Sequence, residues 1–129
     1  MASTLARWVV EKGVDSVNPA MLSAEMRNEI MTEAGMILLK EGRIYEAVKA
    51  VVMAGNSAKL LEMGDEFIRQ TKFEEATLCF IPTKDKARIE KSAAECAKLG
   101  NMNLAYYAFV ASENEQMAAF MKENFCPDA

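Results

Sequence analysis

The side chains that could do chemistry in this sequence are carboxylates, thiols, lysines and arginines, because no histidine occurs among the 129 residues. Histidine is the commonest general base and metal ligand, so its absence removes the serine–histidine and cysteine–histidine pairs that activate nucleophiles. No glycine-rich phosphate loop or dinucleotide fingerprint is present. We therefore predict no catalytic, cofactor-binding or metal-binding residues and favour a protein that is not an enzyme.

Two groups of residues are nevertheless candidates for a cation-binding or reactive site. Glu25, Glu29 and Glu33 recur every four residues and would share one helix face, where they could bind a cation or simply be solvated. Without histidine or a second carboxylate-bearing helix, we favour the solvated face. Cys79 and Cys96 lie on apolar faces and read as core thiols, with no C-x-x-C spacing to suggest zinc or a disulfide framework. We expect Cys126, close to the C-terminus, to be exposed and therefore reactive.

A third group is basic and periodic. Lys40, Arg69 and Lys98 are spaced 29 residues apart, each near the end of a predicted helix. We favour a structural interpretation, in which each cation interacts with the helix macrodipole and stabilises its helix by about 0.3–1 kcal/mol. Alternatively they form a basic ladder that grips a carboxylate-bearing peptide, chiefly through the bidentate guanidinium of Arg69.

The same 29-residue period runs through the elements that would position these residues. It relates the members of five sets, which are Gly42, Thr71 and Gly100; Ala47, Ala76 and Ala105; Gly35, Gly64 and Ala93; Val51, Phe80 and Phe109; and Asn56, Asp85 and Asn114. Fixed periods of this length indicate helical repeats. The Asn and Asp residues are good N-caps, and the sequence predicts helices over 58–69, 86–99 and 115–125.

Within each repeat, a first helix, A, and a second helix, B, have apolar residues three and four positions apart. The predicted core positions are Met31, Leu38, Leu39, Leu60, Phe67, Ile68, Ile89, Cys96 and Ala97 in A, and Ile44, Ala47, Val48, Val51, Phe73, Ala76, Phe80, Met102, Ala105 and Phe109 in B. The glycines and alanine of helix A lack bulk where the alanines of helix B approach, so the two helices can lie close together. Ten methionines could make an adaptable groove, but Met31, Met63 and Met102 fall at core positions and indicate core filling.

The trios Gly35/Ala47/Val51, Gly64/Ala76/Phe80 and Ala93/Ala105/Phe109 resemble the signature of tetratricopeptide repeats over residues 28–124. The period is shorter than the roughly 34 residues of that family. Its closing proline is replaced by Lys59, Arg88 and Met117. Segments 53–56 and 72–76 are also similar to the α-solenoids of vesicle-coat and intraflagellar-transport scaffold proteins.

The resemblance implies an all-α solenoid of antiparallel helix hairpins, a right-handed superhelix of about 8–9 helices. We expect a single domain, 1–129, in which 1–27 is a divergent hairpin, 28–56, 57–85 and 86–114 are repeats, and 115–125 is a polar capping helix. The leading hairpin would contain helices over 4–12 and 19–27, with Asn18 as an N-cap and Trp8 as an anchor.

In tetratricopeptide proteins helix A lines the concave surface. By that resemblance the candidate partner-binding residues are Met36, Leu39, Lys40, Leu61, Asp65, Ile68, Arg69, Ala94 and Lys98, with Ala97 beside them. The implied function is a protein-interaction module, a scaffold or adaptor that binds a peptide or protein segment. The alternatives are a self-associating structural subunit and, in another class, a histidine-free enzyme or small-molecule-binding helical domain.

Composition limits the partners further. Apolar residues make up 51% of the chain and charged residues 26%, which is typical of an ordered, soluble protein. The net charge of −4 and the scattered basic residues give no electropositive stripe for nucleic acid. The apolar stretch 5–12 contains Arg7 and is too short for a signal peptide or a membrane span. We expect a complete, cytoplasmic protein that needs no cofactor and does not insert into membranes.

Overall fold

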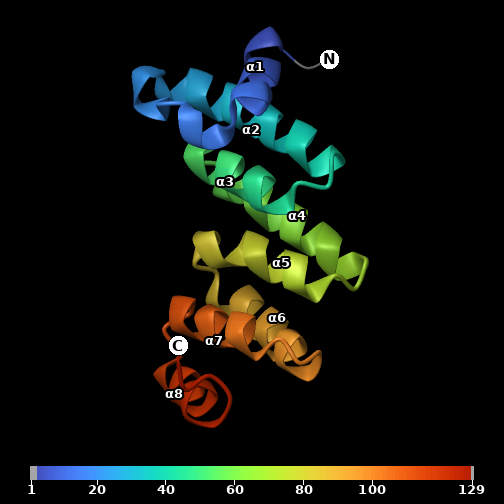
Figure 1. Ribbon diagram of the computed structural model, residues 1–129, viewed down its shortest axis with the longest axis vertical. Coiled ribbons are helices and arrows are strands. Elements are labelled where there is room, and N and C mark those ends of the chain that lie inside the picture. The colour runs from blue at the N-terminus through green and yellow to red at the C-terminus, as the bar shows by residue number, and fades with distance from the viewer. Residues whose placement is uncertain (1–2, 129) are drawn as a thin grey trace. The chain divides into compact units, whose positions relative to one another are not determined.

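The computed structural model describes residues 3–128, in which helices joined by short turns are the regular structure and no β-strand occurs (Figure 1). The elements are α1 Thr4–Lys12, η1 Val14–Ser16, η2 Pro19–Met21, α2 Ala24–Lys40, α3 Ile44–Ala54, α4 Ser57–Arg69, α5 Phe73–Phe80, η3 Ile81–Thr83, α6 Lys86–Lys98, α7 Met102–Ala111 and α8 Glu115–Asn124, where η marks a short 3-10 helix. The predicted all-α class is confirmed. Within the described range, no helix combines the length and hydrophobicity that a membrane span requires.

The helix boundaries follow the 29-residue period. Helices α2, α4 and α6 end at Lys40, Arg69 and Lys98, and α3, α5 and α7 begin at Ile44, Phe73 and Met102. The predicted helices over 58–69, 86–99 and 115–125 correspond to α4, α6 and α8, with each boundary within one residue.

Each A helix ends in a turn with a left-handed residue. Gly42, Thr71 and Gly100 have φ of 77°, 58° and 91°. The next backbone N–H donates to a carbonyl five residues back, for example from Lys72 to Phe67 at 2.8 Å. This bond satisfies a helix-end carbonyl that would otherwise lack a partner. A second left-handed set with the same spacing, Gly55, Lys84 and Glu113, closes each B segment (φ 72°, 61° and 61°).

The chain divides into two compact units, Met1–Leu60 and Leu61–Ala129, with the boundary inside α4. In the first unit α2 packs against α3, and α1 packs against α2. Their shared core includes Val9, Met31, Leu38 and Ala47. A Cβ added at Gly35 would lie 2.6 Å from Val51 Cγ2 and 3.1 Å from the Ala47 carbonyl oxygen, so this glycine permits the close approach of α3.

The leading segment differs from the sequence prediction. No separate helix covers 19–27: Pro19–Met21 is one 3-10 turn, and α2 begins at Ala24. The Ser23 Oγ accepts from the Met26 N–H at 3.2 Å and so caps α2, whereas Asn18 caps only the short turn through the Ala20 N–H. The predicted repeat start at residue 28 therefore falls inside a continuous helix. Trp8 is not a buried anchor, because 47% of it is exposed while Ala6, Val9 and Val10 face the core.

In the second unit α5 packs on α6, α6 on α7 and α7 on α8. A Cβ at Gly64 would lie 2.2 Å from Phe80 Cε1, so this glycine makes room for the phenyl ring. At the matching position in the next repeat, Ala93 is fully buried. Of the three predicted core methionines, Met31 and Met63 are buried and Met102 is half-buried. The third core position predicted in each A helix (Leu39, Ile68, Ala97) is only half-buried.

The last helix is not the polar cap that the sequence predicts. Helix α8 buries Met121 but leaves Met117, Phe120 and the adjacent Phe125 exposed by 37%, 51% and 48%. The reason is that Phe120 stands at a repeat position held by charged residues in the earlier A helices, Glu33, Glu62 and Lys91.

Candidate functional site

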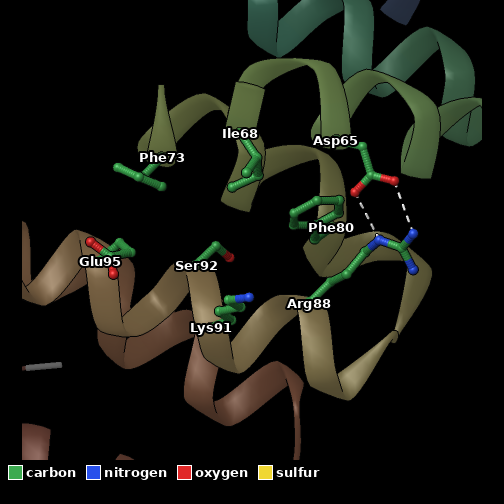
Figure 2. A pocket seen from close by; sticks show the side chains of 8 residues that line it. All are labelled: Asp65, Ile68, Phe73, Phe80, Arg88, Lys91, Ser92 and Glu95. Atoms are coloured by element: carbon green, nitrogen blue, oxygen red, sulfur yellow. Dashed lines mark hydrogen bonds and ion pairs between the residues drawn. The ribbon is translucent and has the colours of Figure 1, made fainter. Parts of the chain in front are cut away.

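A pocket of about 220 Å³ lies within the second unit, among α4, α5 and α6 (Figure 2). Its walls are mostly apolar and its edges are charged. The lining residues are Asp65 and Ile68 from α4, Phe73 and Phe80 from α5, and Arg88, Lys91, Ser92 and Glu95 from α6.

The repeat packing positions the apolar wall. Phe80 is 1% exposed, because its ring is seated over Gly64. Figure 2 shows Ile68 pointing from α4 toward α6, above Ser92. The hydroxyl of Ser92 donates to the Ile89 carbonyl at 3.1 Å, so its proton is engaged within α6. The pocket therefore offers an apolar surface and no free hydroxyl proton from Ser92.

Arg88 closes one end of the pocket. Its Nε and Nη2 donate to the two Asp65 carboxylate oxygens, both at 2.9 Å, and its Nη1 donates to Asp85 Oδ2 at 2.9 Å. The guanidinium carbon lies 6.0 Å from the centre of the Phe80 ring, within cation–π range. This bidentate pair ties α4 to α6 at the pocket edge.

These hydrogen bonds change the titration of both carboxyls. Donation by the Arg88 side chain holds the pKa of Asp65 below its usual range, and the nearby positive charge acts in the same direction. The pKa of Asp85 is also lowered, first by the backbone N–H of Arg88, which Asp85 caps, and then by the guanidinium. Both carboxylates are therefore committed to structural hydrogen bonds at neutral pH.

The nine predicted partner-binding residues are divided between the units. Met36, Leu39 and Lys40 belong to the first unit, and the others belong to the second. None is buried. Only Asp65 and Ile68 line the pocket; Leu61, Arg69, Ala94 and Lys98 do not.

The periodic basic residues of the second unit have partners on their own helices. Arg69 Nη2 lies 2.6 Å from Glu66 Oε2, and Lys98 Nζ lies 3.2 Å from Glu95 Oε1. Glu66 and Glu95 obey the 29-residue period too, and hydrogen bonds from Arg69 lower the pKa of Glu66. In the first repeat, Ile37 takes this place before Lys40. These local pairs favour the helix-end interpretation of Arg69 and Lys98 over a peptide-gripping ladder.

Most residues of the pocket carry no sequence signal of a binding site. Phe73 and Phe80 were predicted only as core residues, and Lys91, Ser92 and Glu95 carry no motif. One sequence signal joins the second and third predicted repeats, which contain Asp65 and Arg88 respectively. The repeat equivalents of Asp65 are Met36 and Ala94, and those of Arg88 are Lys59 and Met117, so only here do a carboxylate and an arginine occupy both positions.

Cys79 and Cys96 are buried and protonated at neutral pH. Burial raises the pKa of Cys79 to about 12, and burial also raises that of Cys96, whose Sγ lies 3.3 Å from Thr77 Oγ1. These two behave as the predicted core thiols. The expectation that Cys126 is exposed is wrong: it is 4% exposed, and its N–H donates to the Met121 carbonyl at 3.0 Å, which folds the chain end back onto α8.

The glutamate strip is a surface feature. Glu25 and Glu29 are exposed, and Glu33 Oε1 accepts the Ser3 N–H at 2.5 Å. Over residues 3–128, no group of acidic or thiol side chains is arranged to hold a metal ion. Comparison of the chain with protein-family models, curated proteins and solved structures finds no match.

Proposed function

We propose that this chain is a protein-interaction module that binds a peptide or protein segment, with the pocket among α4, α5 and α6 receiving an apolar side chain of the partner. The observation that carries the proposal is the combination of an apolar wall (Ile68, Phe73, Phe80) with a rim of both charge signs (Lys91, Glu95). Apolar burial would supply affinity, and the rim charges would fix the orientation of the segment.

The polar groups of the pocket support binding over catalysis. Asp65 is held by Arg88, and the Ser92 hydroxyl donates to a backbone carbonyl. A general base or a nucleophile needs an available lone pair or an activated proton at the reacting atom. Here these groups instead hold the pocket in shape, which is the preorganisation that a binding site requires.

The resemblance to tetratricopeptide repeats supports the same proposal. In this proposal the hairpins stack as a solenoid, as in vesicle-coat and intraflagellar-transport scaffolds, and the module acts as a cytoplasmic adaptor. Asp65 and Ile68, which the resemblance assigns to the partner-binding surface, are two of the pocket-lining residues.

The proposal is tested by selecting peptides from a random displayed library on the wild-type protein and measuring their affinity for two variants. Ile68→Ser removes part of the apolar wall. Leu99→Ser is the matched control, because Leu99 is a 61% exposed aliphatic residue of the same unit that does not line the pocket. We expect Ile68→Ser to weaken binding by about tenfold or more, equivalent to about 1.4 kcal/mol, and Leu99→Ser to leave it unchanged. Equal affinities for wild type and a folded Ile68→Ser protein would contradict the proposal.

A further inference from the structure

Helix α8 occupies the place of an A helix, but the apolar residue at its end is uncovered. At the same repeat position, Leu38, Phe67 and Cys96 are 0%, 8% and 0% exposed, whereas Phe125 is 48% exposed. The second unit therefore presents at Phe125 an apolar side chain whose equivalents in the earlier repeats are buried.

This face is an aromatic surface built from two helices. Phe125 and Phe120 meet edge to face with ring centres 6.0 Å apart. Phe125 also lines a pocket together with Tyr107 of α7. Met117 precedes Phe120 by three residues on α8 and so lies beside it. We call Tyr107, Met117, Phe120 and Phe125 the C-terminal aromatic patch.

The patch is large enough to form the apolar centre of a dimer interface. Tyr107, Phe120 and Phe125 are each about half exposed (56%, 51% and 48%), and Met117 is 37% exposed. Together they offer roughly 400 Å² of apolar surface, since a fully buried aromatic side chain covers about 150–250 Å². A stable interface buries about 800 Å² per partner, of which about 56–65% is apolar. The patch thus supplies most of the apolar area that one partner needs.

The charges around the patch also suit pairing with an identical surface. Helix α7 contains no charged residue, so the α7 part of this face brings no like charges together when two copies pair. On α8, Glu123 lies three residues after Phe120 and therefore beside it, next to Lys122. At the edge, Lys122 lies on α8 together with Glu123, and Asp128 follows; all three are exposed. A two-fold arrangement allows Lys122 of one copy to face a carboxylate of the other.

We propose that the chain forms a two-fold symmetric homodimer through the C-terminal aromatic patch. The patch shares no residue with the pocket among α4, α5 and α6, so this inference does not depend on the proposed peptide-binding function. In the dimer, Phe120 and Phe125 of one copy pack on the same residues of the second copy.

The test is sedimentation equilibrium of the full chain over about 1 µM to 1 mM. The wild type is expected to approach twice the 14.3 kDa monomer mass as concentration rises. Phe120→Glu, at an exposed position, is expected to weaken the dimer by about tenfold or more. The matched control is Leu5→Glu, because Leu5 is a 52% exposed apolar residue of the first unit, outside the patch. Circular dichroism melts confirm that both variants remain folded.

Three results would overturn the inference. A wild type that stays monomeric over the whole range would remove the second copy as the occupant of the patch. Equal weakening by Leu5→Glu and Phe120→Glu would indicate head-to-tail association between the two ends of the chain. Monomeric binding to phosphatidylcholine vesicles that Phe120→Glu abolishes would instead assign the patch to a lipid surface.

Discussion

Gly35 in the first unit and Gly64 in the second hold the same repeat position, yet they accommodate different side chains. Gly35 makes room for the methyl of Val51 and the backbone of Ala47, whereas Gly64 makes room only for the ring of Phe80 among its nearest neighbours. The larger ring also lines the pocket and lies beneath Arg88. A glycine opposite a larger side chain therefore serves both units, but in the second unit the phenylalanine also lines a pocket.

The largest expected effect comes from removing the two side chains that face these glycines. Phe80→Ala should lower the free energy of unfolding by about 3–5 kcal/mol, because a fully buried ring leaves a cavity. Val51→Ala, its counterpart in the first unit, should cost about 2 kcal/mol. Urea titrations of both variants measure the two costs. Equal costs would mean that the ring is not packed as described.

Alanine substitutions at the two glycines test the same helix contacts by adding a Cβ. Gly64→Ala should lower the free energy of unfolding by about 1–3 kcal/mol, since the added Cβ meets a ring that cannot move aside. Adding Phe80→Leu should recover much of this loss. In the first unit, Val51→Ala should restore less of the stability that Gly35→Ala removes, because the Ala47 backbone oxygen remains 3.1 Å from the new Cβ. Double-mutant cycles give both coupling energies, and equal recovery in the two units would contradict the difference proposed between them.

Ala76 tests the register of the repeat. It is fully buried in α5, twelve residues after Gly64. Ala76→Leu should cost about 1–3 kcal/mol by overpacking against neighbouring helices. A thermal melt that is unchanged by this substitution would contradict the register in which α5 packs.

A substitution in the turn after α4 should raise the free energy of unfolding rather than lower it. Thr71 has φ of 58°, a conformation that β-branched residues rarely adopt, whereas its repeat equivalents are glycines. Thr71→Gly should therefore stabilise the chain by about 0.5–1 kcal/mol, the strain released less the entropy of the added glycine. Gly42→Ala is the matched control: nothing lies within 4 Å of the new Cβ, so any loss of stability reflects the backbone conformation. A destabilised Thr71→Gly variant would argue against the strain.

The smallest effect on stability concerns the Asp65–Arg88 ion pair, which joins the second and third repeats. Arg88→Ala should raise the pKa of Asp65 toward its ordinary value of about 3.9. Because the folded-state pKa is lowered, the pair contributes stability above the unfolded pKa and loses it as pH falls through the folded value. With 37% of the Asp65 side chain and 40% of the Arg88 side chain exposed, this contribution is small. Carbon-detected NMR titration of the Asp65 carboxyl measures the shift, and an unchanged pKa would show that Arg88 does not hold it.

The sequence predicts the fold best where several signals share the 29-residue period. The caps at Asn56, Asp85 and Asn114 and the turns after each A helix reproduce the observed helix boundaries. The leading segment is predicted poorly. The sequence predicts a helix start at Asn18 and Pro19, but Ser23 caps α2 instead, and no residue interrupts α2 at position 28. The left-handed residues Lys84 and Glu113 are missed because only their counterpart Gly55 has a residue type that signals this conformation.

The candidate site is predicted less completely than the fold. Asp65 and Ile68 are found because the resemblance places helix A on a binding surface. Phe80 is assigned to the core from its period, and its burial confirms that, but periodicity does not reveal that one edge of a core ring lines a pocket. The Arg88–Asp65 pair links residues 23 positions apart on different helices. Only the three-dimensional packing of α4 and α6 brings these two charges together.

In the function proposed for this chain, a partner binds at the pocket among α4, α5 and α6. The most direct measurement is amide chemical-shift mapping of the 14.3 kDa protein with peptides selected on the wild type. We predict that the largest shifts cluster between residues 65 and 95 and disappear in Ile68→Ser. Shifts that are centred elsewhere, or that persist unchanged in Ile68→Ser, would contradict the account.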